Sequence, residues 1–512
     1  MAVDTSAVTG AEDGAGQGHS TLKRGAIGLA GVVFMVVAFS APITAMTGNL
    51  PVAVGYGNGL GAPAGFLIAT IVLTIFSVGF IALAKHITAA GAFYTFVSRG
   101  WSKIPGLAAG VMSMVTYMTM EAALIGIFSA FTDQAMNSQF GIDLPWELYA
   151  VGCLLVIALL SHFDISVAAK VLGVVLVAEI LMLGLSAVAS LIKAPDGLHF
   201  EALNPVTALS TNGVAGGVVG LGLLMAFWSW VGFESTAIYG EESKDPKRIV
   251  PKATLIAVVG IGVFYTFISW GVIVGNGPDS AVALASGPEP FQLIYTPARE
   301  YLGPWAVTVF EWLVLGGSFA CALAIHNSAA RYLFAFGRDR LLWRRLGDAH
   351  PRHASPWVAS LTQSAVAAAL LLVCSLTKSD PYADLFVLVA IMATVLLLIV
   401  QIMSSISTIV YFHVKKQHPE TANWWRTLLA PIIGGLGMLY VIYLMASNIE
   451  AAAGTASDSL FFKMIPWIIG ILWFGSMGVA LMLRKVDPQR YERIGSTVFD
   501  DRAGELQRAD RA

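Results

Sequence analysis

Charged residues are scarce in this chain of 512 residues, where Asp, Glu, Lys and Arg together make up 12% of the sequence. Soluble globular proteins carry roughly 25%. Hydrophobic residues instead reach 56%, and the mean hydropathy is +0.73. This composition excludes a soluble globular protein and indicates an integral membrane protein whose main partner is the lipid bilayer. The formal net charge of −2 gives no indication of a nucleic-acid partner, because in a membrane protein the distribution of charge is more informative than its sum.

Cysteine is also rare, and the sequence lacks the motifs of metal and nucleotide sites. Cys153, Cys321 and Cys374 each stand alone in an apolar run, so we expect buried free thiols, no disulfide framework and no metal. No GxxxxGK[ST] phosphate loop occurs, which argues against an ATP-driven pump. We therefore expect no cofactor, and an ion gradient as the energy source, with protons favoured and sodium left open.

Clustered catalytic groups are missing as well. The nine histidines are scattered, mostly in loops, as His350 and His353 are. A membrane enzyme would need clustered histidines, paired carboxylates or a nucleophile near a base, so we predict that the protein is not an enzyme. A sensor built on a transport fold would usually need a signalling domain or a long tail, and the sequence indicates neither.

Apolar runs of about 20 residues, the length that crosses a bilayer, divide the chain into twelve candidate spans. They lie near 25–54, 62–84, 105–132, 147–161, 165–192, 213–239, 251–274, 304–335, 357–376, 384–412, 427–447 and 461–483. With the N-terminus in the cytoplasm, 26 of the 30 basic residues fall on the inner side, and only Lys193, Arg299, Lys378 and Lys463 fall outside. The positive-inside rule thus favours an all-α protein of about twelve transmembrane helices with both termini in the cytoplasm.

The two ends of the chain are expected to be cytoplasmic tails. Residues 1–24 are mostly small and polar, with no basic region ahead of an apolar core and cleavage site, so we expect a disordered tail and not a removed signal peptide. The sequence turns abruptly charged from Arg484, and we interpret 484–512 as a second tail.

The first span is interrupted at AFSAPITAMTG (38–48). Pro42 has no amide hydrogen and its ring crowds the carbonyl of Ala38, which predicts two half-helices. Free N–H groups at the start of the second half-helix suit an anionic group such as a carboxylate. A simple proline kink remains the alternative. Substrate contacts are expected from the hydroxyl groups and backbone around the break, at Ser40, Ala41, Pro42, Ile43 and Thr44.

The sixth span is interrupted at FWSWVGFES (227–235), where a carboxylate, Glu234, stands among apolar residues. A charge at membrane depth costs roughly 2.5–3.5 kcal/mol on insertion scales, so Glu234 should face a cavity or polar partners. This makes it a candidate proton acceptor, and a protonated Glu bonded to a neighbouring helix is the alternative. Aromatic rings beside the break suit closure over a small substrate or ordinary packing. The candidate binding residues here are Phe227, Trp228, Ser229, Trp230 and Gly232.

Two more carboxylates lie inside spans and are functional candidates for the same reason. They are Glu121 in the third span and Glu179 in the fifth. Glu311 stands near the outward end of the eighth span, so we interpret it as interfacial.

Three loop motifs are informative in their order and spacing: AAGAFYTF (89–96), GEESKDPKRIVPKA (240–253) and NSAARYLFAFGRDRLLW (327–343). Together with the two interruptions they resemble the amino acid-polyamine-organocation transporter superfamily, of the bacterial amino acid permease type. The resemblance covers about 25–412. It implies a LeuT-like fold of two inverted five-helix repeats, 25–193 and 212–412, with two peripheral helices at 427–483.

The resemblance also implies where the substrate lies, namely between the interrupted first and sixth helices. It places a gating aromatic at Trp228, a proton-sensing carboxylate at Glu234 and substrate contacts at Tyr117 and Glu121. Three departures are apparent. Ser40-Ala41-Pro42 replaces a Gly-Ser-Gly type motif, Glu179 stands where some members have a lysine and is assigned here to proton or ion coupling, and Glu121 favours a substrate with more than one amine.

The expected function is that of a secondary active transporter of the inner or plasma membrane that moves amino acids by alternating access, with proton-coupled symport favoured. Transport of a polyamine or other organic amine, and amino acid exchange, remain alternatives. The sequence leaves the substrate, the coupling ion and the oligomeric state open.

Overall fold

The computed structural model describes residues 25, 27–87, 91–162, 165–194, 196–350, 355–447 and 459–496. The predicted tail at 1–24, and the predicted C-terminal tail beyond 496, lie outside the described residues. The described part of that second tail continues the last helix and adds a short one, α21 (Pro488–Glu492). His353 and the first two residues of the AAGAFYTF motif also lie outside the described residues.

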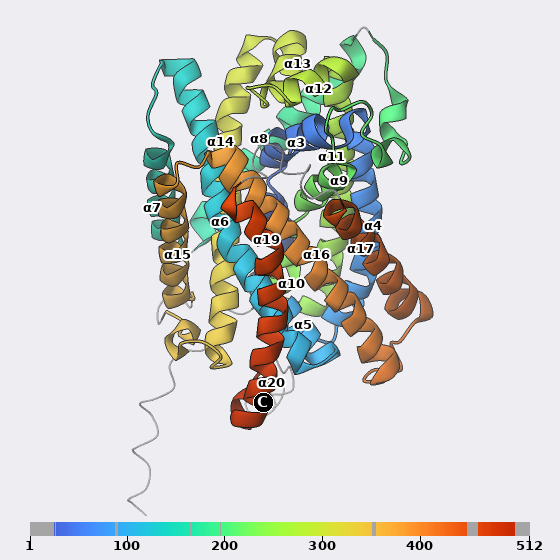
Figure 1. Ribbon diagram of the computed structural model, residues 1–512, viewed down its shortest axis with the longest axis vertical. Helices are drawn as coiled ribbons and strands as arrows, with labels where there is room; N and C mark the ends of the chain where they lie inside the picture. The colour runs from blue at the N-terminus through green and yellow to red at the C-terminus, as the bar shows by residue number, and fades with distance from the viewer. Residues whose placement is uncertain are drawn as a thin grey trace, which may run out of the picture.

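The described chain is helical almost throughout (Figure 1). Its first part contains α1 (Leu29–Ser40), α2 (Pro42–Thr44), α3 (Leu50–Ala53), α4 (Ala62–Ala84), α5 (Phe93–Gly100), α6 (Lys103–Phe140), α7 (Trp146–His162) and α8 (Ile165–Lys193). The second part contains α9 (Val219–Trp228), α10 (Ser235–Ile238), α11 (Pro246–Asn276), α12 (Pro278–Ala285), α13 (Gln292–Leu302), α14 (Pro304–Arg338), α15 (Trp357–Leu376), α16 (Leu388–Ile409), α17 (Ala430–Ala446), α19 (Leu460–Gly470) and α20 (Ser476–Val486). Short π-helical and 3₁₀ segments join or extend them, among them η1 (Ala45–Asn49), η2 (Val54–Asn58), η8 (Pro381–Val387), η9 (Val410–Val414) and η10 (Trp424–Leu429).

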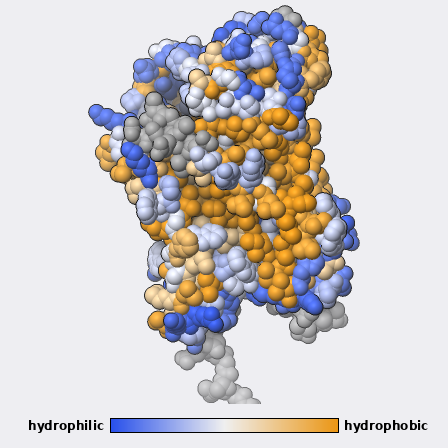
Figure 2. Space-filling view, turned by 45° about the vertical axis from the view of Figure 1, so that its right-hand side comes forward, coloured by the Kyte–Doolittle hydropathy of each residue, from blue (hydrophilic) through white to orange (hydrophobic). Residues whose placement is uncertain are grey.

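Length and composition mark this as a multi-pass membrane protein. Within the described residues, nine helical stretches are long and apolar enough to cross a bilayer, the first of them covering Leu29–Ala84. Two shorter apolar helices, Trp146–Ser161 and Val219–Trp228, coincide with the fourth predicted span and with half of the sixth. Figure 2 shows the resulting apolar band, with hydrophilic residues gathered toward both ends of the molecule. The all-helical membrane class is confirmed, while the number of crossings and the inverted repeat stay predictions.

Two long helices, α6 and α14, pack along each other at the centre of the molecule. Helix α6 can run for 38 residues because Pro105 stands in its first turn, where its missing N–H is harmless. The helix ends where Gly141 adopts φ 65° and its N–H bonds back to the Asn137 carbonyl. Helix α14 packs against α1 and α2, and Tyr117 of α6 contacts Phe39 and Glu234, one at each interruption.

The three loop motifs are joined to one another at one end of the molecule. Tyr94 of the first motif donates to Asp339 of the third over 2.6 Å, and the Gly495 N–H bonds to both side chains. Arg331 of the third motif forms an ion pair with Glu242 of the second over 2.8 Å. These contacts fix α5, α14 and the loop after α10 relative to one another.

Candidate functional site

The first helix is interrupted between α1 and α2. Ala41 adopts φ 39° and ψ 75°, a left-handed conformation that ends α1 at Ser40, and α2 begins at Pro42. Proline fits the first position of the new helix, since its N–H would have no intrahelical partner there. The N–H groups of Ile43 and Thr44 follow in the first turn, outside the helical hydrogen-bond pattern, and give this end a positive partial charge.

Neighbouring helices satisfy the carbonyl groups that the first break frees. The Tyr265 hydroxyl of α11 donates to the Ser40 carbonyl over 2.8 Å, and the Cys321 thiol of α14 donates to the Phe39 carbonyl over 2.8 Å. The Ser40 hydroxyl bonds to the Val36 carbonyl within its own helix. The cost of breaking a helix in the membrane is therefore met on the carbonyl side by protein groups.

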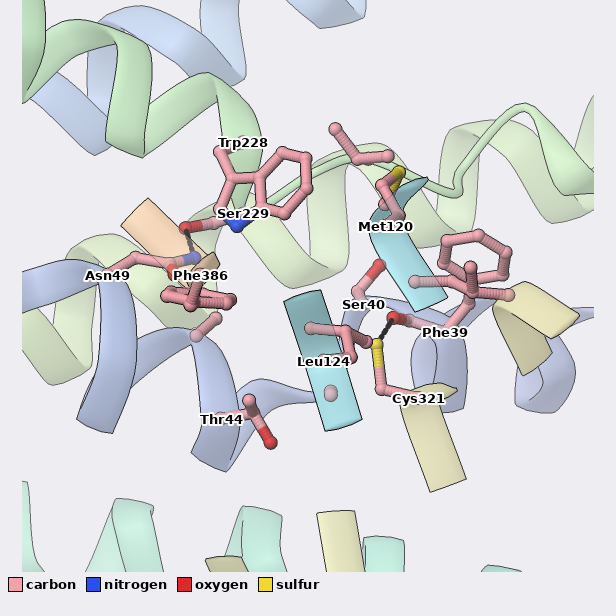
Figure 3. A pocket seen from close by; sticks show the side chains of 14 residues that line it. Phe39, Ser40, Thr44, Asn49, Met120, Leu124, Trp228, Ser229, Cys321 and Phe386 are labelled. Atoms are coloured by element: carbon pink, nitrogen blue, oxygen red, sulfur yellow. Dashed lines mark hydrogen bonds between the residues drawn. The ribbon is translucent and has the colours of Figure 1, made fainter. Parts of the chain in front are cut away.

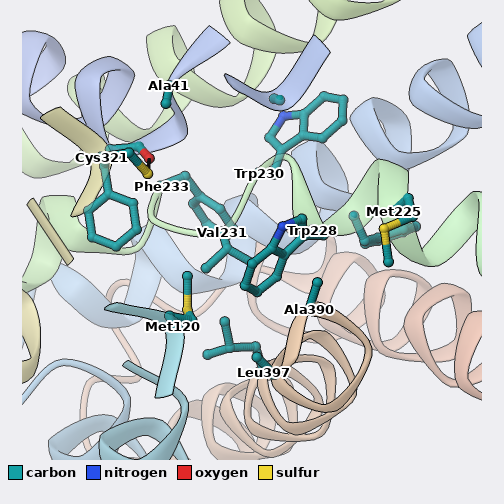
Figure 4. Close-up of a cluster of buried hydrophobic side chains, with 14 of the residues drawn as sticks. Ala41, Met120, Met225, Trp228, Trp230, Val231, Phe233, Cys321, Ala390 and Leu397 are labelled. Carbon is teal, nitrogen blue, oxygen red and sulfur yellow. Dashed lines mark hydrogen bonds between the residues drawn. The ribbon is translucent and has the colours of Figure 1, made fainter. Parts of the chain in front are cut away.

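The second break separates α9 from α10. After Trp228 the chain makes a series of turns, with Gly232 at φ 111°, and a helix resumes at Ser235. A Cβ atom at position 232 would lie 1.9 Å from Cδ1 of Phe39, so only glycine permits this approach of the two interrupted helices. Trp228 and Trp230 leave the turn on opposite sides (Figure 4). Trp230 is buried and donates to the Val258 carbonyl over 3.2 Å, away from the cavity described next.

A cavity of about 30 Å³ lies where the two breaks meet (Figure 3). The described residues that line it are Phe39, Ser40, Ala41, Thr44, Ala45, Asn49, Met120, Leu124, Trp228, Ser229, Val231, Cys321, Ile325 and Phe386. None of these residues carries a charged side chain. The walls are mainly apolar, and the polar groups come from the interrupted first helix and from Ser229.

A hydrogen bond joins the two interrupted helices across this cavity. Asn49 Nδ2 donates to Ser229 Oγ over 2.8 Å, and the Ser229 hydroxyl donates in turn to the Met225 carbonyl over 2.9 Å. Asn49 Oδ1 and Thr44 Oγ1 are buried with no hydrogen-bond partner among the described residues. A buried polar atom without a partner costs about 1–3 kcal/mol, so these two atoms are available to a guest.

Glu179 lies beside the start of the second half-helix. Its carboxyl group interacts with the backbone N–H of Ile43, and its Oε2 atom is buried without a partner among the described residues. Gly317 of α14 permits this arrangement, because a Cβ there would lie 2.7 Å from both Glu179 Oε1 and Ile43 Cγ2. The carboxyl group therefore lies at the positive end of a helix, next to but outside the lining of the cavity.

Glu234 lies at the other break and is fully buried. Its carboxylate accepts hydrogen bonds from the Tyr117 hydroxyl and from the Gly232 N–H, the latter over 3.1 Å. The Tyr117 ring stacks on Tyr332 at 5.3 Å. Glu234 thus links the second break to α6 and does not line the cavity.

Glu121 belongs to a separate polar cluster between α6, α14 and α15. Its carboxylate contacts His326 Nδ1 at 3.0 and 3.1 Å and accepts from Gln363 Nε2 at 2.7 Å. His326 Nε2 lies 2.8 Å from Ser360 Oγ. The side chains of Glu121 and His326 are both fully buried. The cluster satisfies the carboxylate that the sequence marked as a substrate contact, while Met120 next to it lines the cavity.

Of the residues singled out in the sequence, the structure brings five together around the cavity: Ser40, Ala41, Thr44, Trp228 and Ser229. The other nine lie near it or behind it without lining it: Pro42, Ile43, Tyr117, Glu121, Glu179, Phe227, Trp230, Gly232 and Glu234. Sequence reasoning missed Asn49, Cys321 and Phe386. Asn49 carried a usable indication, because it is an amide inside an apolar span, and such a group must face a partner or a cavity.

The geometry defines a multi-pass membrane protein with a mainly apolar cavity, carrying a few polar groups, between two interrupted helices. A family model described as "Amino acid permease" matches residues 27–474, and the chain belongs to this family. The resemblance carried by the loop motifs is thereby confirmed. Members of the family are transporters, and amino acid or amine transport is the class of function that the comparisons support.

Curated relatives agree with this assignment. The branched-chain amino acid permease of Bacillus subtilis (strain 168) is 23% identical over 404 residues, which cover 76% of this chain and 80% of the relative. The branched-chain amino acid permease of Lactococcus lactis subsp. cremoris is 24% identical over 316 residues, 58% of this chain and 64% of the relative. The low-affinity putrescine importer of Escherichia coli (strain K12) is 22% identical over 356 residues, 67% of this chain and 74% of the relative.

Proposed function

We propose that this protein is a secondary active transporter that carries an apolar, neutral amino acid across the plasma membrane together with a proton. One observation carries the proposal: both interrupted helices line a single cavity, whose walls are apolar and whose polar groups match an amino acid backbone. Phe39, Met120, Leu124, Val231, Ile325 and Phe386 supply apolar walls suited to a branched aliphatic side chain.

The substrate's charged groups have complementary positions at the cavity. Its carboxylate suits the positive end of the helix that begins at Pro42, where the Ile43 and Thr44 N–H groups lie. Its ammonium group suits the buried acceptors Asn49 Oδ1 and Thr44 Oγ1. The cavity needs no charged side chain to neutralise such a substrate, because the positive and negative groups of a zwitterion balance each other.

The cavity must enlarge to admit such a molecule. A single water molecule needs a cavity of about 10–15 Å³ by the same measure, so a cavity of about 30 Å³ holds one or two waters and is too small for an amino acid. Trp228 from α9 and Phe386 from η8 lie edge to face at 6.2 Å on the cavity wall. We assign the opening of the cavity to a displacement of Trp228 and Phe386, which accompanies movement of the interrupted helices. Opening to one side of the membrane at a time is the alternating-access mechanism.

Glu179 supplies a physical reason for proton coupling. When ionised, its carboxylate competes with the substrate carboxylate for the positive end of α2 and repels it. When protonated, it leaves that end to the substrate. Substrate and proton then bind together and dissociate together, which is symport. Glu234 keeps its predicted coupling role as the second candidate.

A cationic amine is the second candidate substrate, supported by the likeness to a putrescine importer. An ionised Glu179 would attract such a substrate, so binding would release a proton instead of requiring one. The absence of charged side chains among the described residues lining the cavity favours the neutral amino acid. The two candidates thus differ in the sign of their pH dependence.

The test is uptake by the purified full-length protein in proteoliposomes under an imposed pH gradient, with labelled leucine, valine and putrescine, each with and without sodium. We expect leucine or valine to accumulate when the outside is acidic, without a sodium requirement. If only putrescine accumulates, and an alkaline exterior drives its uptake, the substrate is an amine and not an amino acid. No accumulation or exchange of any of the three under any gradient would contradict the proposal.

A further inference from the structure

A second and larger cavity, of about 660 Å³, lies on the surface at the end of α4. Its walls come from α4, from the start of α11 and from the segment that joins α16 to α17 through η9 and η10. Helices α4 and α17 pack side by side here, as Figure 1 shows. None of its lining residues belongs to the transport cavity.

Three cations line this cavity: Lys85 at the end of α4, Lys252 in the first turns of α11, and Arg426 in η10. Within the described residues, no ion pair or side-chain hydrogen bond joins any of the three to a partner. The lining contains a single carboxylate, Glu420, which is bonded to His418 over 2.8 Å. The cavity therefore carries a surplus of positive charge.

The lining also contains apolar side chains from α4 and α11. Val78, Ile81 and Ala82 of α4 form one side, and Leu255 of α11, which is 40% exposed, forms the other. Trp424 and Trp425 stand next to Arg426 and are 68% and 46% exposed. Tryptophans are enriched at the level of lipid headgroups, which favours a position at the membrane interface for the cations and the apolar residues beside them, together called the groove below.

Hydrogen bonds fix the joining segment over the end of α4. Asn423 Oδ1 accepts from the Trp425 and Arg426 N–H groups, each at 3.0 Å, and caps η10. Thr421 Oγ1 lies 3.0 Å from His86 Nε2, and the rings of His86 and His418 stack at 4.1 Å. These hydrogen bonds hold the backbone that carries Arg426, while Lys85 and Lys252 stand on the ends of helices. The backbone positions of all three cations are therefore fixed by structured segments.

We infer that this groove is a binding site for an anionic phospholipid, whose phosphate lies among Lys85, Lys252 and Arg426 and whose acyl chain lies along α4 and Leu255. Basic pockets between membrane helices on the cytoplasmic side bind acidic headgroups for this reason. Lys85 and Arg426 fall in loops that the charge distribution assigns to the cytoplasm, and Lys252 lies at the cytoplasmic end of the seventh predicted span, so anionic lipids of that leaflet are within reach. A soluble anion would match the cations but not the apolar residues of the groove. The inference is independent of the proposed transport.

The test is competition between phosphatidylglycerol and phosphatidylcholine with the same 1-palmitoyl-2-oleoyl chains, followed by native mass spectrometry of the full-length protein. We expect the protein to retain phosphatidylglycerol preferentially. The variant Lys85→Gln/Lys252→Gln/Arg426→Gln should lose about 100-fold in affinity for it, since each basic residue near a lipid surface contributes about fivefold. Its affinity for phosphatidylcholine should not change.

The matched control is Arg344→Gln/Arg484→Gln/Lys485→Gln, which removes three exposed cations that do not line the groove. We expect this variant to keep the full preference. Equal losses in the two variants, or no preference in the unaltered protein, would overturn the inference. Displacement of the lipid by millimolar inorganic phosphate would also overturn it and assign the groove to a soluble anion. The competition in the unaltered protein decides the matter even if the triple variant fails to fold.

Discussion

Asn49 donates a hydrogen bond to Ser229 over 2.8 Å, although the two residues are 180 positions apart. Each belongs to one of the two interrupted helices, and both line the cavity where the breaks meet. Because the Ser229 hydroxyl already donates to the Met225 carbonyl, its oxygen is left to accept from Asn49. The bond therefore orients the Asn49 amide and leaves its buried oxygen without a partner among the described residues, as the proposed contact with a substrate ammonium group requires.

Replacing Asn49 by alanine should weaken substrate binding about 10- to 150-fold, since a lost hydrogen bond to a charged group contributes about 1.5–3 kcal/mol. Ser229→Ala should weaken it less, because it removes only the group that orients the amide. Substrate affinity of the two single variants and of the double variant measures the coupling. Thr70→Ala is a matched control, since Thr70 is a buried residue bonded to the Phe66 carbonyl and away from the cavity. Strictly additive effects of the two changes would contradict this role.

Gly232→Ala should abolish uptake and lower the melting temperature. The added Cβ would lie 1.9 Å from Phe39 Cδ1, and φ 111° is a conformation that residues with a side chain rarely adopt. Overpacking alone costs about 1–3 kcal/mol. The control is Gly260→Ala, because a Cβ at 260 would have nothing within 4 Å and the residue lies inside α11. Equal melting temperatures of the two variants would show that the close approach of the two breaks is wrong.

His326→Ala should destabilise the protein by about 1–3 kcal/mol, because it removes one of the two hydrogen-bond partners of the buried Glu121 carboxyl group. The double variant Glu121→Leu/His326→Leu should be more stable than His326→Ala, since replacing both partners of a buried polar contact by apolar groups leaves no carboxyl group without its partner. Thermal unfolding in detergent measures both. If His326→Ala instead left stability unchanged and altered substrate selectivity, Glu121 would be a substrate contact, as the sequence first indicated.

Stability of the segment over α4 should depend on pH through His86, which lies outside the spanning segments. Burial, and then the positive charges of His418, Lys247 and Lys85, hold the pKa of His86 below its usual value against the opposing charge of Glu420. The folded state then binds fewer protons than the unfolded state, so stability rises with pH through the window that ends near the ordinary pKa, about 6.5. His86→Gln should make the rise of the melting temperature with pH shallower below about pH 6.5, and should leave its slope unchanged at higher pH, where His86 is neutral in both states. An unaltered slope in the variant would remove His86 as its cause.

The sequence predicted the two breaks because their causes are local. Pro42 lacks an amide hydrogen, and Gly232 stands in an apolar run with a carboxylate two residues on. The side chains that bond to the freed carbonyl groups at the first break could not be predicted in this way. Tyr265 and Cys321 reach the carbonyls of Ser40 and Phe39 from helices more than 200 residues away. Sequence spacing holds no information about which faces of distant helices meet.

Glu121 is a second case in which the sequence could not show which distant residues meet. Its position in an apolar span correctly implied that polar partners or a cavity must surround it. The choice between the two depended on His326 and Gln363, which are 205 and 242 positions away. The family motifs gave long-range information where residue chemistry could not, because the contact of Tyr94 with Asp339 joins two of them.

The pH dependence of leucine uptake by Glu179→Gln tests the central claim most directly. Glutamine keeps the size of the side chain beside Ile43 but cannot ionise, so it cannot compete with the substrate carboxylate by charge. We predict that initial uptake by the unaltered protein rises as the outer pH falls, and that Glu179→Gln binds leucine with an affinity that no longer depends on pH. Glu311→Gln, which removes a buried carboxylate bonded to Ser138 and Gln139 outside the cavity, should behave like the unaltered protein. An unchanged pH dependence in Glu179→Gln would contradict proton coupling at the first break.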